Sequence, residues 1–218
     1  MTSTNGILLE RENVSATLIQ AALDELIVSI DGLTPETYRI YRVGGELSQV
    51  VSGMKTLRRL RDEQGARNPK IILQWLPMKH NEHELPNVEK QATEWGADTV
   101  EIKTAQIYSE EDAEAFLPKN TRLSRYQRHE NGWEVQRRYQ HCRRLWFSCQ
   151  IDWDGTVVPC CFDKDEAYVV GNLHETSLSD IWRGKKFQQL RRLLLTKGRV
   201  LEMCRNCTEG LRTFYVLR

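Results

Sequence analysis

The amino-acid sequence predicts an α/β protein in which a sheet of parallel strands is followed by a small cysteine-rich domain. Within residues 1–104, short apolar runs alternate with amphipathic helical patterns. This order is expected of a parallel sheet built from right-handed strand–helix–strand units. All six cysteines lie after residue 141, so the C-terminal part of the chain has a different chemistry from the sheet that precedes it.

Three short runs of mostly apolar residues are the predicted strands. They span Leu26–Ile30, Ile71–Leu76 and Thr99–Lys103. The first run stops at Asp31-Gly32 and the second at Pro77, which are residues that end strands and begin turns. Apolar strands of this kind are typical of a parallel sheet that helices cover.

Helical patterns occupy the segments between these strands, at residues 13–24, 46–63 and 84–95. In the second pattern, apolar residues such as Val50 and Met54 share one face, and arginine and lysine lie opposite. Gly96 follows the third pattern and suits the C-terminal cap of a helix. Each pattern therefore predicts a helix that packs against the sheet.

The rest of the chain divides into a connector and the cysteine-rich domain. Residues 105–140 are polar, contain an Asn131-Gly132 turn signal, and are predicted to be the connector. In the C-terminal domain, Trp153–Val158 predicts a hairpin that turns at Asp154-Gly155. Residues 177–197 predict one helix with Ser177 as its N-terminal cap.

The composition excludes several classes of protein. The 218 residues are 40% hydrophobic and 28% charged, with a net charge of +1, which favours a folded core and gives no reason to expect a nucleic-acid partner. The longest apolar run is about five residues, whereas a membrane-spanning helix needs roughly 20. The N-terminus also lacks the layout of a secretion signal. We expect a cytoplasmic protein without a membrane partner.

Four of the six cysteines have the spacing of a metal or iron–sulfur site. Cys142, Cys160, Cys204 and Cys207 form a Cys-x17-Cys-x43-Cys-x2-Cys pattern. Two residues between the last two thiols allow both sulfurs to reach one ion or cluster. Four thiolates suit zinc as well as an iron–sulfur cluster, and ligand chemistry alone favours zinc. The pattern could also consist of structural thiols or disulfides, and the absence of a secretion signal argues against disulfides.

Several C-terminal segments carry a family resemblance. They are Cys142-Arg143-Arg144-Leu145-Trp146, Asp154–Cys161, Gly171-Asn172-Leu173, Ile181-Trp182 and Cys204-Arg205-Asn206-Cys207. Together they resemble the auxiliary-cluster domain of radical SAM enzymes, which is called SPASM or, in its one-cluster form, twitch. The N-terminal part resembles the third to sixth strands of the radical SAM (β/α) barrel. The segments that carry this second resemblance are Thr4-Asn5-Gly6, Val28–Gly32, Tyr41–Gly45, Leu76–Asn81 and residues 98–104.

The resemblance implies a partial (β/α) barrel of parallel strands followed by a SPASM/twitch domain with one auxiliary [4Fe–4S] cluster. Its ligands would be the four cysteines of the spacing pattern. Cys160 has the family's Pro-Cys position, and adjacent side chains on a strand face opposite ways, so Cys161 is not chosen. We expect Cys149 to be a buried apolar thiol.

The resemblance also implies contacts with S-adenosylmethionine, because barrel enzymes place their sites at the C-terminal ends of strands. Ser29, Asp31 and Asn81 lie at such ends and are the predicted cofactor-binding residues. A structural role is equally open for Asp31, which could instead form a turn with Gly32. For Asn81 the case for a structural role is stronger, since polar residues near buried strands often satisfy backbone groups.

The sequence also departs from the family. It contains no Cys-x3-Cys-x2-Cys, the motif that holds the S-adenosylmethionine-cleaving cluster in the family, and its first strand corresponds to the third strand of the barrel. We therefore expect an N-terminally truncated protein. Its predicted parts are a partial barrel at 1–104, a connector at 105–140 and the SPASM/twitch domain at 141–218.

The function expected from the resemblance is part of an enzyme that modifies a peptide or small molecule by radical chemistry. The chain alone is predicted not to cleave S-adenosylmethionine, so its activity as an enzyme stays open. Two different functions compete with this one: a non-catalytic iron–sulfur module, which would carry electrons or bind a partner, and a zinc-stabilised interaction domain. An exposed strand at the edge of the partial barrel would favour self-association or a partner chain.

Overall fold

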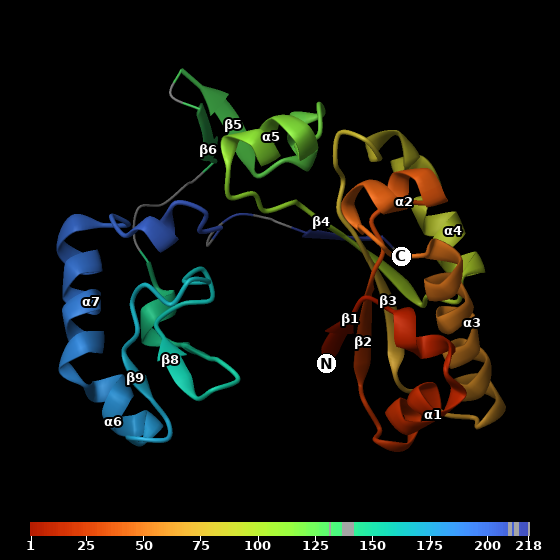
Figure 1. Cartoon of the computed structure of the whole chain (residues 1–218), viewed down its shortest axis with the longest axis horizontal. Coiled ribbons are helices and arrows are strands. Elements are labelled where there is room, and N and C mark those ends of the chain that lie inside the picture. Colours follow the sequence, from red (N-terminus) through yellow and green to blue (C-terminus); the bar gives the residue numbers. More distant parts are fainter. Residues whose placement is uncertain (131, 137–141, 209–210, 212–213, 218) are drawn as a thin grey trace. The chain divides into compact units, whose positions relative to one another are not determined.

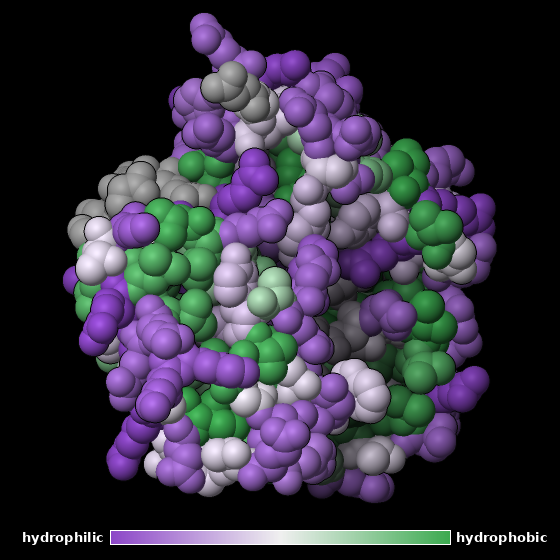
Figure 2. Space-filling view, turned by 60° about the vertical axis from the view of Figure 1, so that its left-hand side comes forward, coloured by the Kyte–Doolittle hydropathy of each residue, from purple (hydrophilic) through white to green (hydrophobic). Residues whose placement is uncertain are grey.

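The structure, a computed structural model, describes residues 1–130, 132–136, 142–208, 211 and 214–217. It divides the chain into two compact units (Figure 1). The first unit contains Met1–Arg125 together with the strand nearest the C-terminus, and the second contains Tyr126–Arg212. Hydrophobic and hydrophilic residues are interspersed over the surface seen in Figure 2. None of the helices in these described ranges is long and apolar enough to cross a membrane.

The first unit is built on a five-stranded sheet with the order β1-β2-β3-β4-β10. The strands are β1 (Thr2–Thr4), β2 (Glu25–Ser29), β3 (Lys70–Trp75), β4 (Thr99–Lys103) and β10 (Phe214–Leu217). β1 to β4 are parallel in chain order. β10 pairs with β4 in the antiparallel direction, and β1 forms the other edge of the sheet. The α/β class and the parallel sheet expected from the sequence are therefore confirmed.

Helices lie together on one side of this sheet in Figure 1. They are α1 (Glu12–Gln20), α2 (Pro35–Tyr41), α3 (Leu47–Glu63) and α4 (Val88–Glu94), with the 3-10 turns η1 (Ile7–Glu10) and η2 (Glu82–Asn87). Alternate strand residues such as Val28 and Leu73 form one buried cluster with Val50, Met54 and Leu57 of α3. Burying these side chains is the main favourable term for the unit, at about 1.5–3 kcal/mol for each large one.

The described residues of the predicted connector, residues 105–140, include several short elements. They contain the helix α5 (Glu110–Phe116), the 3-10 turn η3 (Thr121–Leu123) and a hairpin of β5 (Tyr126–His129) with β6 (Gly132–Val135). Ser109 caps α5 by accepting a hydrogen bond from the amide of Asp112. Gly132 of the predicted turn signal begins β6, and Asn131 lies outside the described residues. These elements are short and polar, so their hydrophobic periodicity is too weak to be read from sequence.

Besides the hairpin of β5 and β6, the second unit has a small three-stranded antiparallel sheet and two helices. Its strands are β7 (Gln150–Ile151), β8 (Thr156–Val158) and β9 (Gly171–Asn172), and the β7–β8 turn contains Gly155 at a φ of 80°. The 3-10 turns η4 (Arg144–Trp146) and η5 (Glu202–Cys204) flank this region in sequence. The predicted hairpin and its Asp154-Gly155 turn are therefore present.

The predicted helix over residues 177–197 is two helices, α6 (Leu178–Arg183) and α7 (Lys185–Lys197). Ser177 caps α6 as expected, accepting from the amide of Asp180 at 3.2 Å. The break comes at Gly184, whose extended backbone (φ −67°, ψ 161°) ends one helix and begins the next. The apolar spacing continues through the break, which is why the sequence predicts a single helix.

The division into units also differs from the predicted domain boundaries. It falls after Arg125 rather than after residue 104 or 140, and strand β10, expected in the C-terminal domain, pairs with β4. A β-strand can pair with a strand far away in sequence, and no local pattern near β10 indicates its partner. The predicted boundaries of the functional domains stay a prediction.

An ion pair holds α3 to the start of β3 and β4. Arg61, which is almost fully buried, donates to the carboxylate of Asp98 at 2.5 Å and to the carbonyl of Pro69 at 2.8 Å. The amide of Ile71 also donates to Asp98, at 2.8 Å. Burial alone would raise the pKa of Asp98, but these hydrogen bonds outweigh it and hold that pKa below its usual value.

This geometry predicts acid sensitivity that depends on Asp98. Because its folded pKa is lowered, the ionised carboxylate stabilises the fold above its unfolded pKa of about 4, and the stabilisation is lost as the pH falls through the folded pKa. We expect Asp98→Asn to lower the free energy of unfolding by about 2 kcal/mol at neutral pH, because it removes the carboxylate that buried Arg61 contacts most closely and leaves only the longer contact with exposed Asp62. Urea unfolding of both proteins across the pH range measures the difference.

The difference in unfolding free energy between the wild type and Asp98→Asn should shrink as the pH falls from about 5 to about 3. Glu63→Gln, at the exposed end of α3, is the matched control and should change stability by no more than about 0.5 kcal/mol. A difference between wild type and Asp98→Asn that stays constant down to the lowest pH would contradict the assignment.

Candidate metal centre

The second unit brings four cysteines from separate segments to one small cavity of about 10 Å³. Cys142 precedes η4, Cys160 follows β8, Cys204 ends η5 and Cys207 follows three residues later. All four line the cavity, the last three are buried, and Cys142 is half-buried. These are the four cysteines of the predicted ligand set, and neither Cys149 nor Cys161 lines the cavity.

Local backbone contacts position the thiols. The amide of Asp163 donates to the carbonyl of Cys160 at 3.0 Å, and the buried Asp163 carboxylate accepts from the amides of Ala167 and Tyr168, both at 2.9 Å. This turn fixes the chain where it leaves β8. At the other side, the amide of Cys207 donates to the carbonyl of Cys204 at 3.2 Å, so the two-residue spacer forms a tight turn.

The remaining lining of the cavity is apolar and basic. Leu145, Phe162 and Met203 supply apolar surface, and Arg144 and Arg199 supply positive charge. The cavity contains no carboxylate among its lining residues in the described part of the chain. Thiolates in this cavity would therefore lie near two arginine side chains and near no carboxylate among the described lining residues.

For two of these thiols, Cys204 and Cys160, the surroundings raise the pKa and so favour the protonated form. Burial, followed by the neighbouring Cys207 and Cys142, raises the pKa of Cys204 to about 11. A hydrogen bond with Cys161 and then burial also raise the pKa of Cys160. A bound metal deprotonates such thiols, because its charge outweighs the cost of burying thiolates.

The two cysteines outside the cavity have different surroundings. Cys161 is exposed, and its sulfur accepts from Nη1 of Arg144 at 3.1 Å. Its side chain also keeps a hydrogen bond with Cys160, because both residues lie beyond the end of β8, where the strict alternation of a strand no longer applies. Cys149 is half-buried against the apolar cluster of the unit, and burial raises its pKa.

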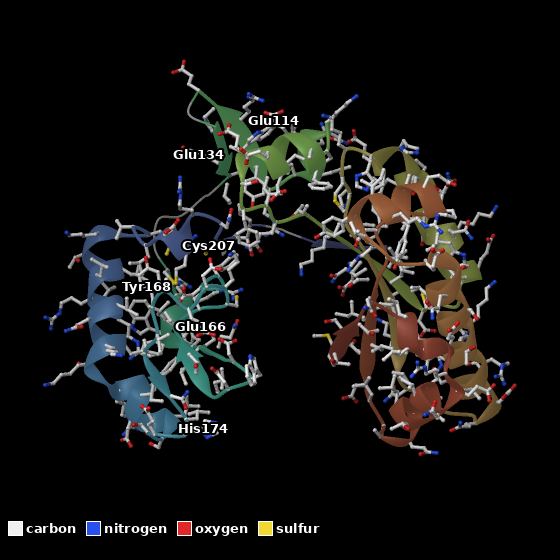
Figure 3. All side chains as sticks on the ribbon, in the orientation of Figure 1. Glu114, Glu134, Glu166, Tyr168, His174 and Cys207 are labelled. Carbon is white, nitrogen blue, oxygen red and sulfur yellow. The ribbon has the colours of Figure 1, made fainter. Side chains whose placement is uncertain are left out.

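The donor set fits a soft thiophilic group. Four sulfur atoms around one apolar cavity suit zinc or an iron–sulfur cluster, and do not suit magnesium or calcium. As the described side chains stand, no three His, Cys, Asp or Glu groups among them are close enough together to hold a metal ion. The fit therefore rests on the four cysteines that line one cavity. Figure 3 shows Cys207 and Tyr168 toward one end of the second unit, away from His174.

The predicted S-adenosylmethionine contacts lie in the first unit, at the ends of β2 and β3. The buried carboxylate of Asp31 accepts from Nε of Arg42 at 2.6 Å and from the amide of Leu76 at 3.0 Å. Burial raises the pKa of Asp31, and the charge of Arg42 offsets part of that rise. Asp31 thus joins the ends of two neighbouring strands.

Asn81 completes this junction. Its amide nitrogen donates to the carbonyls of Asp31 and Leu76, both at 2.9 Å, and its oxygen accepts from the amide of Met78 at 2.6 Å. All the polar atoms of the buried Asn81 side chain are used within the chain. The structure therefore supports a structural role for Asp31 and Asn81, and contact with S-adenosylmethionine stays a prediction.

Ser29 lies in a different setting. It ends β2 and is half-buried, and the register places it beside Gln74 of β3, which in turn lies beside Glu101 of β4. The buried alternate positions of these strands pack with the helices, so this polar row occupies the opposite face of the sheet. Glu101 was missed from sequence because a lone acidic residue in a strand gives no signal until its neighbours are known.

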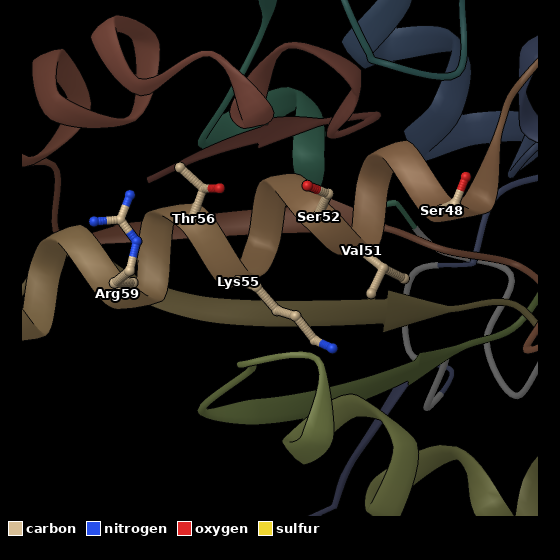
Figure 4. A pocket seen from close by; sticks show the side chains of 6 residues that line it. All are labelled: Ser48, Val51, Ser52, Lys55, Thr56 and Arg59. Carbon is tan, nitrogen blue, oxygen red and sulfur yellow. The ribbon is translucent and has the colours of Figure 1, made fainter.

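A further hollow of about 420 Å³ lies along the exposed face of α3 (Figure 4). Its lining residues all come from that one helix: Ser48, Val51, Ser52, Lys55, Thr56 and Arg59. Arg59 is already paired with Glu12 and Glu63. A surface formed by one helix alone offers few converging groups, so the cysteine cavity is the better candidate for a functional site.

Comparison with known proteins agrees with this choice. Residues 142–208 match the family model of the SPASM domain, described as an iron–sulfur cluster-binding domain. The match begins at the first of the four cysteines and ends just after the last. The cysteine-rich unit thus carries a SPASM domain.

Two relatives are similar in sequence to this chain, one over most of its length and the other over about a quarter of it. One is the tungsten-containing aldehyde ferredoxin oxidoreductase cofactor-modifying protein of Pyrococcus furiosus, to which the chain is 25% identical over 236 aligned positions. This alignment covers 94% of this chain and 64% of that protein. The other is the S-adenosyl-L-methionine-dependent 2-deoxy-scyllo-inosamine dehydrogenase of Niallia circulans, to which the chain is 39% identical over 54 residues. This shorter alignment covers 24% of this chain and 22% of that enzyme.

Solved structures show the same fold. Streptococcus suis SuiB bound to S-adenosylmethionine aligns with a TM-score of 0.59 and 14% identity, over 96% of this chain and 54% of that chain. Histidine-tagged anSMEcpe with bound AdoMet aligns with a TM-score of 0.57 and 15% identity, over 96% of this chain and 61% of that chain. The chain therefore spans less than two-thirds of the length of these relatives.

The fold and the site thus define an α/β protein whose C-terminal unit places four cysteines around one cavity. More specifically, residues 142–208 match the SPASM domain, and the chain resembles the radical SAM/SPASM proteins in sequence and in fold. The resemblance predicted from the sequence is confirmed at this level.

The junction at Asn81 generates a prediction about stability. Asn81→Ala leaves two carbonyls and one amide without their partner, so we expect the free energy of unfolding to fall by about 2–3 kcal/mol. Asn13→Ala, on the exposed face of α1, is the matched control and should change stability by no more than about 0.5 kcal/mol. Urea unfolding measures both, and an Asn81→Ala protein as stable as the control would contradict the structural assignment.

Proposed function

We propose that this chain binds one auxiliary [4Fe–4S] cluster through Cys142, Cys160, Cys204 and Cys207. The observation that carries the proposal is that these four cysteines, from segments up to 65 positions apart in sequence, line one cavity. The matched SPASM region contains all four. Four protein ligands are the number that a [4Fe–4S] cluster takes.

Zinc is the second candidate for the same cavity. Four cysteine thiolates form a common structural zinc site, and the side chains alone favour neither group decisively. The SPASM match supports the cluster, because that family is described as binding iron–sulfur clusters. A zinc-stabilised interaction domain is the function that goes with zinc.

We further propose that the chain is part of an enzyme that modifies a peptide or small molecule by radical chemistry. Two observations support this. The α/β fold aligns over 96% of the chain with two proteins solved with bound S-adenosylmethionine. One curated relative is a cofactor-modifying protein, and another is an S-adenosylmethionine-dependent dehydrogenase. The competing function is that of a non-catalytic module that transfers electrons or binds a partner.

Iron and sulfide analysis tests the cluster. After anaerobic reconstitution we expect about four irons and four sulfides per chain, as one [4Fe–4S] cluster requires. Cys204→Ala should lose the cluster, because it removes a buried ligand from the cavity. Iron, acid-labile sulfide and zinc are measured on the same purified samples.

Cys149→Ala and Cys161→Ala are the matched controls, since both are cysteines of the same unit that do not line the cavity. Both should keep full iron and sulfide content. Stoichiometric zinc without sulfide in the wild type would overturn the cluster in favour of zinc. Loss of the cluster in either control variant would show that the ligand set is assigned wrongly.

A second test concerns S-adenosylmethionine cleavage. Reductive cleavage needs a cluster iron that is left open for the methionine part, and the 218 residues contain no Cys-x3-Cys-x2-Cys. We predict that this chain, reconstituted and reduced with dithionite, forms no more 5′-deoxyadenosine than a cluster-free control. Product above that control would mean that the four cysteines do not all act as cluster ligands.

A further inference from the structure

Arg199 is a buried arginine whose position depends on the residue before it. Gly198 ends α7 with a φ of 71°, in the region that side-chain-bearing residues rarely adopt, and its amide donates to the carbonyl of Leu194. The chain then turns so that Arg199 is only 9% exposed and lines the cysteine cavity. Arginine is rarely buried to this degree unless it has a partner.

The guanidinium of Arg199 is directed at a predicted ligand. Its Nη1 lies 3.5 Å from Sγ of Cys207, within hydrogen-bonding range for sulfur. The charge of Arg199 also lowers the pKa of Cys204, although burial dominates and leaves that pKa raised. The second arginine that lines the cavity, Arg144, donates to exposed Cys161 instead.

We propose that Arg199 is a positioning residue of the cluster site, which donates to the Cys207 sulfur and sets the reduction potential of the bound group. The inference rests on the proposed cluster. Hydrogen bonds to ligand sulfurs and nearby charge are known determinants of cluster potentials. Reduction adds one electron to a group that four thiolates already make electron-rich, and a buried cation stabilises the added charge. Arg199 therefore raises the potential.

The test compares variants of the full chain after reconstitution. Arg199→Gln removes the charge, and Arg199→Lys keeps the charge but loses the forked guanidinium. Arg192→Gln is the matched control, because Arg192 belongs to α7 and does not line the cavity. For each protein we would measure iron and sulfide content, and then the midpoint potential by a redox titration followed by electron paramagnetic resonance.

We expect Arg199→Gln to bind the cluster with a midpoint potential shifted to more negative values, Arg199→Lys to show a smaller shift in the same direction, and Arg192→Gln to match the wild type. A loaded Arg199→Gln protein with the wild-type potential would overturn the inference and leave the proposed cluster intact. Absence of iron and sulfide from the wild type would overturn the cluster and the inference together.

If Arg199→Gln loses the cluster, the Arg199→Lys variant decides whether Arg199 sets the reduction potential or has only a structural role. A purely structural arginine would change how much cluster the Lys variant binds without moving its potential, and that result would overturn the inference. A loaded Lys variant with a more negative potential would support it.

Discussion

The second unit depends on one constraint, which is that four cysteines far apart in sequence must meet at one cavity. Its apolar core is small, and Cys160 and Cys204 belong to it together with Phe187 and Leu194. The core and the candidate metal centre therefore share residues. A domain of this size gains much of its stability from whatever crosslinks its core, so metal binding and folding are expected to be coupled.

Much of this architecture follows from local patterns. The strands over Glu25–Ser29, Lys70–Trp75 and Thr99–Lys103 lie within one residue of their predicted positions, because each is a buried apolar run between clear stop signals. Ser177 and Gly155 act as predicted, since capping and left-handed turns depend on single residues. The four cysteines could be singled out from spacing and from the resemblance of their surroundings to a known domain.

The rest depends on contacts that no local pattern contains. The pairing of β10 with β4, the break at Gly184 and the hairpin of β5 and β6 are decided by tertiary packing. Asp31 and Asn81 look like cofactor contacts in sequence, but their atoms are used to tie two strand ends together. Arg199 gave no signal because an isolated arginine after a helix is usually solvated, and only the folded cavity shows that it is buried.

The return of β10 to the sheet makes the first unit discontinuous in sequence, with the second unit as an insertion joined to it at both ends. During synthesis β10 is made only after the whole insertion, so the sheet has an open edge at β4 until that point. A unit whose two ends are both connected to the same sheet also has fewer conformations available than a unit connected at one end. Pairing of β10 with β4 therefore both completes the sheet and closes the length of chain that contains the inserted unit.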